Sequence, residues 1–350
     1  MFRTKIDLSK ATSEQKHAFE MREFFQPKKA RTIRMSSAFS RIGEDKAAKK
    51  LLECGSYLDF GHFTDDTNRL VTANFCKNRL CPMCSWRRSL KKYSDLSDVF
   101  SVLENTHEFV FLTLTERNCT AEQLRDRMQH LKKAFRKWLR RQSLSVFDGC
   151  YMSLEITYND KEDTYHPHLH IILCAPQGAY FGTAAYMPFE KWLSEWVEVG
   201  EYDYEPSIRV NKVANKTVYN QRTRKYVTIS LKKALKEVAA YSVKDCDFFK
   251  NGMEQEQTDK AISVIYAALK NFRLFEFYGV MKDLNKHFKA EKHSDDDDLI
   301  NITDKPTVKA EIEYHLVYVW SFVPELNLYR YVLTSAPPDL KQKKEKNKGS

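Results

Sequence analysis

The residues best suited to chemistry in this sequence are three histidines at every second position, His166, His168 and His170, within the segment Tyr165–Cys174. Side chains alternate along a β-strand, so a strand here would place the three imidazoles on one face and apolar side chains on the other. Three of the ten histidines in the chain fall in this one run. The pattern favours a metal or phosphate site over histidines that are merely held on a strand.

A second strand would bring a carboxylate to the same place. The segment Tyr151–Tyr158 alternates apolar and polar residues, and the polar stretch Asn159–Thr164 follows it, so we expect an antiparallel hairpin with the histidine segment. If the apolar faces match, Glu155 projects beside His168 and His170, and the third histidine stays at the strand edge. One carboxylate and two neutral imidazoles can hold a divalent cation with positions left for substrate oxygens. A plain surface charge is the alternative for the glutamate.

Four cysteines form a second candidate metal site. Cys76, Cys81 and Cys84 have the spacing Cys-x4-Cys-x2-Cys, and a tight Cys-x2-Cys turn places two sulfurs on one ion. We take Cys54, which a glycine follows, as the fourth ligand of a structural Zn²⁺, with His62 as the substitute. Buried free thiols are the alternative.

The charge of the chain indicates the kind of partner. There are 57 Lys and Arg against 47 Asp and Glu, a formal net charge of +10, which favours a polyanion such as nucleic acid. Cations also follow the cysteines at the start of an expected helix, where they would contact DNA unless they form only a solvated charged face. These candidates are Arg79, Arg87, Arg88, Lys91 and Lys92.

Membrane and secretion signals are not recognisable in the sequence. No apolar run reaches the length of a bilayer span, and the N-terminal residues lack the apolar core of a signal peptide, so we expect a cytoplasmic protein without a membrane partner. Eight cysteines in such a reducing compartment favour metal thiolates over disulfides.

Several further elements would surround the two sites. His107–Thr115 has the composition of a buried strand that ends in threonines. Thr120–Gln123 has the form of a capping box that opens an amphipathic helix. Thr258–His293 is expected to be largely helical. The residues 311–322 and 328–333 are expected to form a strand hairpin.

A helix rich in Ala, Leu, Lys and Glu is expected over Leu231–Lys244. Glu237 and Tyr241 are four residues apart on it, and Lys244 follows three residues later. Side chains at these spacings line one face of a helix.

In chain order, these motifs resemble those of the HUH endonucleases, most closely the rolling-circle replication initiators of small Gram-positive plasmids. The matching residues are Phe111–Thr115 as motif one, His166–His170 as motif two and Tyr241–Lys244 as motif three. Phe75–Cys84 resembles the cysteine segment of one plasmid group with a single active-site tyrosine. The resemblance covers roughly residues 54–250.

The resemblance implies a site-specific DNA nickase and strand transferase. In this family a metal held by a His-His-acid site, here Glu155, His168 and His170 with Mg²⁺ or Mn²⁺, polarises a backbone phosphate. A tyrosine, here Tyr241, attacks that phosphate and leaves a 5′-phosphotyrosine and a free 3′-OH primer. Lys244 is expected to stabilise phenolate or phosphate charge.

Glu237 indicates how the cycle would end. Some initiators use a second tyrosine on this helix, whereas the single-tyrosine group has a glutamate four residues earlier, as here. The resemblance implies that Glu237 activates a water for a hydrolytic terminating cleavage. An ordinary glutamate on a helix surface is the alternative.

The fold implied by the resemblance is α+β, with an RRM-like or palm-like central antiparallel sheet, helices mainly on one face, the metal site on the other, and a small zinc-binding subdomain. The expected divisions are a basic N-terminal arm or helices (1–50), a zinc-binding, DNA-contacting subdomain (51–100), the nickase domain (101–250), a helical and strand extension (251–340) and a disordered basic tail (341–350).

The implied partners are plasmid origin DNA, single-stranded or as a hairpin, and the host helicase and DNA polymerase, while a homodimer is left open. Three other functions remain as alternatives. His166–His170 also fits a histidine-triad nucleotide hydrolase, in which the middle histidine is the nucleophile and no metal is needed. The chain could also be a zinc protein that only binds DNA, or an HUH transposase or relaxase; the cysteine segment and Glu237 favour the plasmid initiators.

Overall fold

The structure is a computed structural model of the 350-residue chain. It describes residues 13–213, 219–220, 225–226, 228–240, 243, 248–250, 252–292, 299–300 and 311–334. The chain divides into two compact units, one made of residues 1–87 and 296–350 and the other of residues 88–295.

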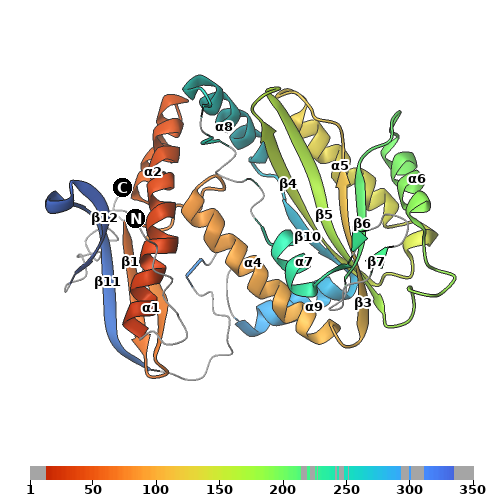
Figure 1. The fold of residues 1–350 in the computed structure, drawn as a ribbon, viewed down its shortest axis with the longest axis horizontal. Helices are drawn as coiled ribbons and strands as arrows, with labels where there is room; N and C mark the ends of the chain where they lie inside the picture. Colours follow the sequence, from red (N-terminus) through yellow and green to blue (C-terminus); the bar gives the residue numbers. More distant parts are fainter. Residues whose placement is uncertain are drawn as a thin grey trace, which may run out of the picture. The chain divides into compact units, whose positions relative to one another are not determined.

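A four-stranded antiparallel sheet in the first unit joins segments from both ends of the chain (Figure 1). β1 (Tyr57–Phe63) lies between β2 (Thr67–Ala73) and β11 (Ile312–Val323), and β12 (Leu328–Thr334) forms an edge. The predicted hairpin near the C-terminus is confirmed as β11 and β12. The sequence did not predict β1 and β2, because polar residues and a glycine interrupt their apolar alternation.

Helices from the N-terminal segment belong to the same unit. α1 (Ser13–Glu20), a short π-helix (Met21–Phe25) and α2 (Gln26–Arg41) follow one another directly, and α3 (Asp45–Glu53) comes next. The buried Phe25 ring packs edge-on against Phe60 of β1, with ring centroids 5.4 Å apart. The end of the π-helix, just before α2, therefore packs against the sheet.

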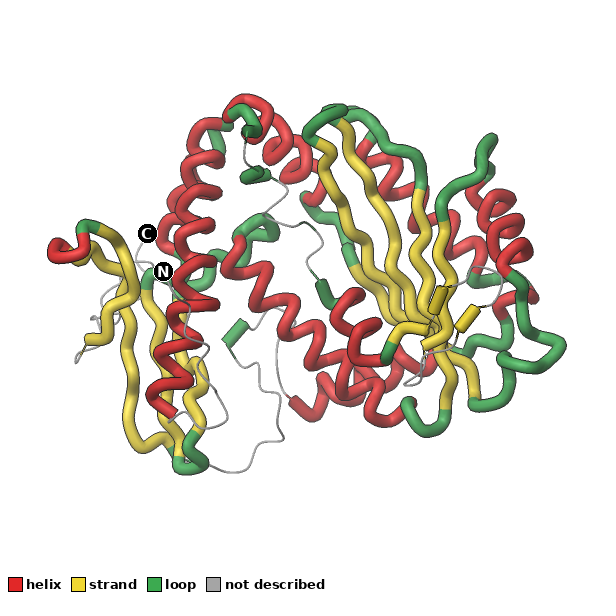
Figure 2. Tube along the Cα trace, viewed as in Figure 1, coloured by secondary structure: helices red, strands yellow, loops and turns green. Residues whose placement is uncertain are grey.

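The second unit is built on a six-stranded sheet in the order β10-β4-β5-β3-β6-β9 (Figure 2). Among the described strands, all neighbours are antiparallel except β6 and β9. A separate pair is formed by β7 (Tyr219–Asn220) and β8 (Lys225–Tyr226). The strands of the large sheet are β3 (His107–Thr115), β4 (Gly149–Asn159), β5 (Thr164–Pro176), β6 (Ile208–Val213), β9 (Thr228–Ile229) and β10 (Phe275–Tyr278). The predicted antiparallel hairpin of the glutamate and histidine segments is confirmed by β4 and β5.

Helices cover both faces of this sheet, whereas we expected them mainly on one. On the face of Met152 and Leu154, α5 (Leu124–Trp138) reaches β10 through salt bridges to Glu276, and the Trp138 ring of α5 packs on α6 (Phe189–Gly200). The prediction is wrong because only one end of the histidine face is polar; further along the strands its side chains are apolar and must be covered by helices.

On the histidine face, the strand residues beyond the histidines are apolar, and helices bury them. Phe111, Tyr151 and Ile172 form a buried core there with residues of α4 (Pro82–Leu103), α7 (Leu231–Val238) and α9 (Gly279–Lys292). The polar end of this face holds the histidines. The strand β3 begins and ends where the sequence predicted, at His107 and Thr115.

Two predicted helix boundaries are wrong. α5 begins at Leu124 with Gln123 as its N-cap, so Thr120 is not the cap; only the Gln123 side chain makes a capping-box bond, accepting the Thr120 N–H at 3.3 Å. α7 ends at Val238 and not at Lys244, because the Ala240 N–H bonds to the carbonyl only three residues before it, at 3.3 Å, and so tightens the last turn.

The predicted helix over Thr258–His293 is interrupted. It consists of α8 (Gln255–Leu269), the strand β10 and α9. β10 is an edge strand of the sheet, and its alternating residues pair with β4. This long-range pairing outweighs the helical preference of the flanking residues.

Candidate functional site

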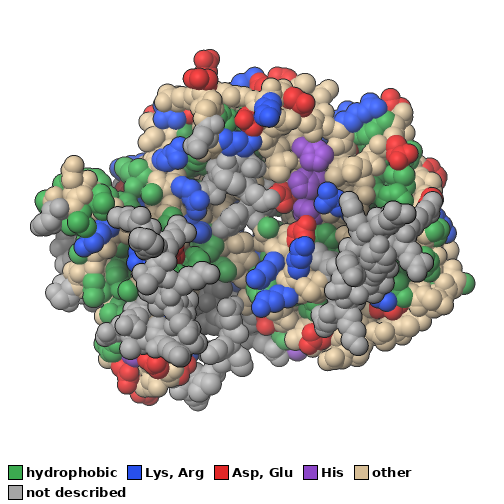
Figure 3. Space-filling model, viewed as in Figure 1, with side chains coloured by type: hydrophobic (Ala, Val, Ile, Leu, Met, Phe, Trp, Pro, Cys, Tyr) green, Lys and Arg blue, Asp and Glu red, His purple; other side chains and the backbone are tan. Residues whose placement is uncertain are grey.

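Three neighbouring strands of the second unit position the histidine cluster. Glu155 of β4 lies directly opposite His168 of β5, and His170 lies between Ser153 of β4 and Thr113 of β3. Because side chains alternate along each strand, all of these point to one face of the sheet. Figure 3 shows histidine side chains grouped on the surface there, with acidic and basic side chains close by.

The side chains of Glu155, His168 and His170 converge tightly. Glu155 Oε2 lies 3.3 Å from His170 Nε2 and 3.8 Å from His168 Nε2. The three ligand atoms all lie within 4.8 Å of one another, and each residue is buried. The structure thus brings together the three side chains that the sequence predicted to converge.

The hydrogen bond and the pKa of His168 show why a cation fits between these three side chains. His168 Nδ1 lies 3.2 Å from the His166 carbonyl, which can only accept, so Nδ1 carries the hydrogen. Burial, reinforced by the nearby His170, lowers the pKa of His168 to about 4 although Glu155 opposes the shift. At neutral pH the Nε2 lone pair of His168 therefore faces a carboxylate oxygen. Two acceptors in this arrangement suit a shared cation, and a histidine that donates its other N–H to a carbonyl is typical of metal ligands.

The four predicted cysteines form a compact cluster in the first unit. Cys54 Sγ lies 3.5 Å from both Cys81 Sγ and Cys84 Sγ, and Cys76 Sγ lies 3.7 Å from Cys84 Sγ. Four sulfurs held about 2.3 Å from a tetrahedral Zn²⁺ would lie about 3.8 Å apart, and a disulfide needs only about 2.05 Å. The fourth member of the cluster is Cys54 and not His62. The His62 side chain is directed elsewhere, with its Nδ1 3.0 Å from Asn68 Oδ1.

Residues of α2 support the cysteine cluster from a distant part of the sequence. The Lys29 ammonium is buried and donates to the carbonyls of Leu52 at 2.6 Å and Cys54 at 2.9 Å. The buried Thr32 hydroxyl lies 3.7 Å from Cys81 Sγ. Burial lowers the pKa of Lys29, while the nearby thiols of Cys54 and Cys81 oppose this shift. The sequence missed this contact, because Lys29 lies in a run of cations typical of a solvated surface.

The predicted DNA-contacting cations differ in their surroundings. Arg79 is exposed, whereas Arg88, Lys91 and Lys92 are half-buried, and the Lys92 ammonium lies 5.0 Å from the centre of the Phe275 ring. Arg87 is buried and donates to the carbonyls of Leu299 at 2.9 Å and Ile300 at 3.3 Å. The Arg87 guanidinium therefore binds backbone carbonyls of the first unit and is not exposed for a DNA contact.

Of the three predicted catalytic residues, the structure describes only Glu237. Its side chain is half-buried on α7, and α7 packs through Ala234, Leu235 and Val238 into the core on the histidine face of the sheet. Tyr241 and Lys244 lie outside the described residues. The helix that carries Glu237 therefore lies on the same face as the carboxylate and the two histidines.

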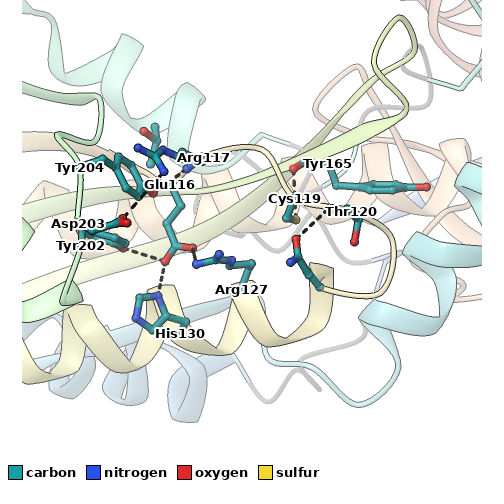
Figure 4. Close-up of polar contacts among 12 residues, drawn as sticks. Glu116, Arg117, Cys119, Thr120, Arg127, His130, Tyr165, Tyr202, Asp203 and Tyr204 are labelled. Atoms are coloured by element: carbon teal, nitrogen blue, oxygen red, sulfur yellow. Dashed lines mark hydrogen bonds and ion pairs between the residues drawn. The ribbon is translucent and has the colours of Figure 1, made fainter.

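A buried carboxylate at the end of β3 was missed by the sequence reasoning. Glu116 Oε1 accepts hydrogen bonds from His130 Nδ1 and, at 2.8 Å, from the Tyr202 hydroxyl, while Arg127 Nη1 lies 3.7 Å from Oε2 (Figure 4). Its side chain is fully buried. The residues come from the segment just after β3, from α5 and from the loop after α6, so no spacing in the sequence links them.

Within the described part of the chain, no helix is long and apolar enough to cross a bilayer.

Comparison with known proteins gives consistent matches. The family described as Replication protein matches residues 67–330. A "Protein rep" of Bacillus sp is 33% identical over 281 residues, which cover 77% of this chain and 90% of the relative. A "Protein rep" of Bacillus amyloliquefaciens is 31% identical over 284 residues, 79% of this chain and 82% of the relative. A "Replication protein" of Staphylococcus aureus is 25% identical over 219 residues, 62% of this chain and 88% of the relative. No solved structure matches significantly.

Proposed function

Because the chain belongs to the family described as Replication protein, we propose that it initiates rolling-circle replication of a plasmid by nicking one strand of the origin DNA. The observation that carries this proposal is the convergence of Glu155, His168 and His170, whose ligand atoms lie within 4.8 Å of one another. The proposed site of action is the cytoplasm. Single-stranded or hairpin origin DNA is the proposed substrate; a host helicase would unwind the duplex and a host DNA polymerase would extend the 3′-OH.

The histidine cluster is the proposed metal centre. Glu155 Oε2 and the Nε2 atoms of His168 and His170 are the proposed ligands, and the His166 carbonyl and the Thr113 hydroxyl orient the two rings. A bound Mg²⁺ or Mn²⁺ would act as a Lewis acid on the scissile phosphate. Two imidazole nitrogens among three ligands favour Mn²⁺, since Mg²⁺ prefers oxygen ligands.

The proposed nucleophile is Tyr241. Its phenolic oxygen forms a bond to phosphorus while the bond from phosphorus to the 3′ oxygen breaks. The phenolic proton passes to solvent, and the leaving 3′ oxygen takes up a proton to become the 3′-OH primer. Lys244 is the proposed partner for the charge on the phenolate or phosphate. The phosphotyrosine retains the energy of the broken bond, so the strand can be rejoined without a nucleoside triphosphate.

Glu237 is the proposed base for the end of the cycle. It would accept a proton from the water that makes the terminating cleavage. Its half-buried position on α7, on the histidine face of the sheet, supports this role.

The cysteine cluster is the proposed structural zinc site. The sulfurs of Cys54, Cys76, Cys81 and Cys84 all lie within 4.8 Å of one another, and three of their separations are 3.5–3.7 Å, which suits tetrahedral coordination. We retain residues 51–100 as the zinc-binding, DNA-contacting subdomain and 101–250 as the nickase domain. Arg79, Arg88, Lys91 and Lys92 remain the proposed DNA contacts of this segment.

The proposal is tested by covalent capture. Full-length protein is incubated with Mn²⁺ and with single-stranded oligonucleotides that tile the plasmid encoding the chain, each labelled at its 3′ end. We expect one oligonucleotide to form a labelled protein band that resists denaturation, and we expect EDTA to abolish it.

Four variants complete the capture experiment. Tyr241→Phe and His170→Ala should lose the adduct, whereas His166→Ala, the matched control for the neighbouring histidine, should retain it. An adduct that survives in Tyr241→Phe would overturn the proposal, as would metal-independent hydrolysis that requires His168 but not Tyr241. That last result would indicate a histidine-triad hydrolase; His168→Ala provides this comparison.

A further inference from the structure

Arg117 follows the end of β3, two residues after the threonine that pairs with His168. Thr115, the last residue of β3, lies directly opposite His168, and its hydroxyl donates to the Ser207 carbonyl at 2.6 Å. The chain then continues through Glu116 and Arg117 before Cys119 pairs with Tyr165 at the start of β5. Arg117 is therefore presented at the end of the sheet that holds the metal ligands.

The buried Glu116 anchors this turn. Its carboxylate accepts from Tyr202 and His130 and lies beside Arg127, so it joins β3 to α5 and to the loop before β6. Figure 4 shows Glu116 pointing toward α5, while Arg117 lies on the other side, against Tyr204. The next residue along the chain thus projects away from the α5 face of the sheet.

Tyr204 holds the Arg117 side chain in place. The guanidinium carbon lies 3.7 Å from the centre of the Tyr204 ring, and the Tyr204 hydroxyl accepts the Arg117 backbone N–H at 2.9 Å. Stacking fixes the plane of a guanidinium and leaves its N–H edge available for a phosphate. The Asp203 carboxylate is 4.0 Å away, with both side chains largely exposed, 64% and 89%, so that ion pair contributes little.

A second arginine lies on the same face of the sheet. Arg209 of β6 is opposite Thr113, which is in turn opposite His170. Neighbouring strands are about 4.8 Å apart, so the backbone of Arg209 lies about 10 Å from that of His170. Arg209 is exposed and has no hydrogen bond or ion pair to any residue that the structure describes.

We propose that Arg117 and Arg209 bind two backbone phosphates of the single DNA strand whose scissile phosphate enters the histidine cluster, and that Tyr204 positions Arg117. This inference rests on the proposed function and adds to it the path of the strand across β3 and β6. The contacts read charge and not sequence, because phosphates are common to every nucleotide.

Binding of a single strand tests this path without cleavage. The affinity of full-length protein for a fluorescent oligonucleotide, the one captured in the covalent assay, is measured by anisotropy in EDTA at several salt concentrations. We expect Arg117→Gln and Arg209→Gln each to weaken binding about tenfold and to lower the slope of log affinity against log salt by about 0.7. Arg140→Gln, a control at an exposed arginine after α5, should leave both unchanged.

Tyr204 variants separate positioning from folding. Tyr204→Leu removes the ring under Arg117 and should weaken binding about as much as Arg117→Gln. Tyr204→Phe keeps the ring and loses only the bond from the exposed Arg117 backbone N–H, which water can replace, so it should bind nearly as tightly as the parent protein. Equal effects of the two variants would contradict the positioning role. Circular dichroism of all variants should match the parent protein, and a loss of folded signal in Tyr204→Leu would also count against that role.

Neutral phosphates identify the contacts directly. Methylphosphonate groups are placed at one position at a time in the same oligonucleotide. A methylphosphonate at one position should weaken binding to the parent protein but not to Arg117→Gln. A methylphosphonate at a different position should weaken binding to the parent protein but not to Arg209→Gln.

Two results distinguish the possible failures. If the parent protein forms the adduct but the arginine variants keep its affinity and salt slope, the strand path is wrong and the proposed function stands. If the parent protein neither binds single strands nor forms an adduct, the proposed function itself is wrong.

Discussion

Glu155 and His168 stand directly opposite each other on β4 and β5, and Glu155 Oε2 lies 3.8 Å from His168 Nε2. The other ring nitrogen of His168, Nδ1, donates its hydrogen to the His166 carbonyl at 3.2 Å. The free lone pair and the carboxylate thus face each other within a buried site, which is the arrangement from which a cation centre is inferred.

The charge of Glu155 should control metal affinity. Glu155→Gln keeps the shape of the side chain but removes its negative charge, so we expect Mn²⁺ binding, measured by calorimetry, to weaken at least about tenfold. The nicking rate should fall about 10²-fold or more, since metal stabilisation of a transition state is worth several kcal/mol. Glu162→Gln, at the exposed tip of the same hairpin, is the control. Unchanged Mn²⁺ affinity in Glu155→Gln would remove Glu155 from the ligand set.

The pKa of His168 should make the metal-free protein sensitive to acid. Burial lowers this pKa from 6.5 to about 4, so the unfolded chain takes up the proton first as the pH falls. The contribution of His168 to the free energy of unfolding is full above pH 6.5 and is lost toward pH 4, at about 1.4 kcal/mol per pH unit. Urea unfolding in EDTA at pH 7, 6 and 5 measures this loss. His168→Gln should show a flatter pH dependence; parallel curves for the two proteins would refute the assignment.

Lys29 should strengthen zinc binding. Four thiolates and one Zn²⁺ carry a net charge of −2, and the buried ammonium on the Cys54 carbonyl offsets part of it. Lys29→Met should therefore weaken zinc binding about 10-fold to 100-fold in competition with a chromophoric chelator. Lys46→Met, on the exposed surface of α3, should bind zinc as the parent does. Equal zinc affinities of the two variants would show that Lys29 has no electrostatic role.

Glu237 should act on termination and not on initiation. We expect Glu237→Ala to form the covalent adduct at the parental rate but to release DNA from it by hydrolysis about 10²-fold more slowly, because a general base contributes at least that much. The half-life of the adduct in a chase with unlabelled oligonucleotide measures the effect, and Lys236→Ala, its exposed neighbour, is the control. Loss of both steps, or of neither, would argue against a termination-specific role.

The parts of the fold that the sequence predicted are those governed by local rules. A short polar turn and two alternating segments determine the register of β4 and β5, so the side of the sheet on which Glu155 projects follows from the sequence. Pairing between distant segments was missed. β1 pairs with β11, which lies about 250 residues later in the chain. β10 forms a strand because it pairs with β4, which is more than 100 residues away in the sequence.

The same distinction applies to the sites. The spacing of Cys76, Cys81 and Cys84 indicates one cluster, since all three lie within a short stretch of chain. Lys29 and Glu116 could not be found in this way. Their roles depend on how α2 packs against the cysteine segment and how the loop before β6 packs against β3.

The proposed function requires that Tyr241 becomes joined to the 5′ phosphate of nicked DNA. The most direct test is mass spectrometry of the adduct after digestion with trypsin and nuclease. We predict that the residual nucleotide is carried by the peptide that contains Tyr241, with fragment ions assigning it to the Tyr241 oxygen. A nucleotide on His168, or on any other residue, would show that Tyr241 is not the nucleophile.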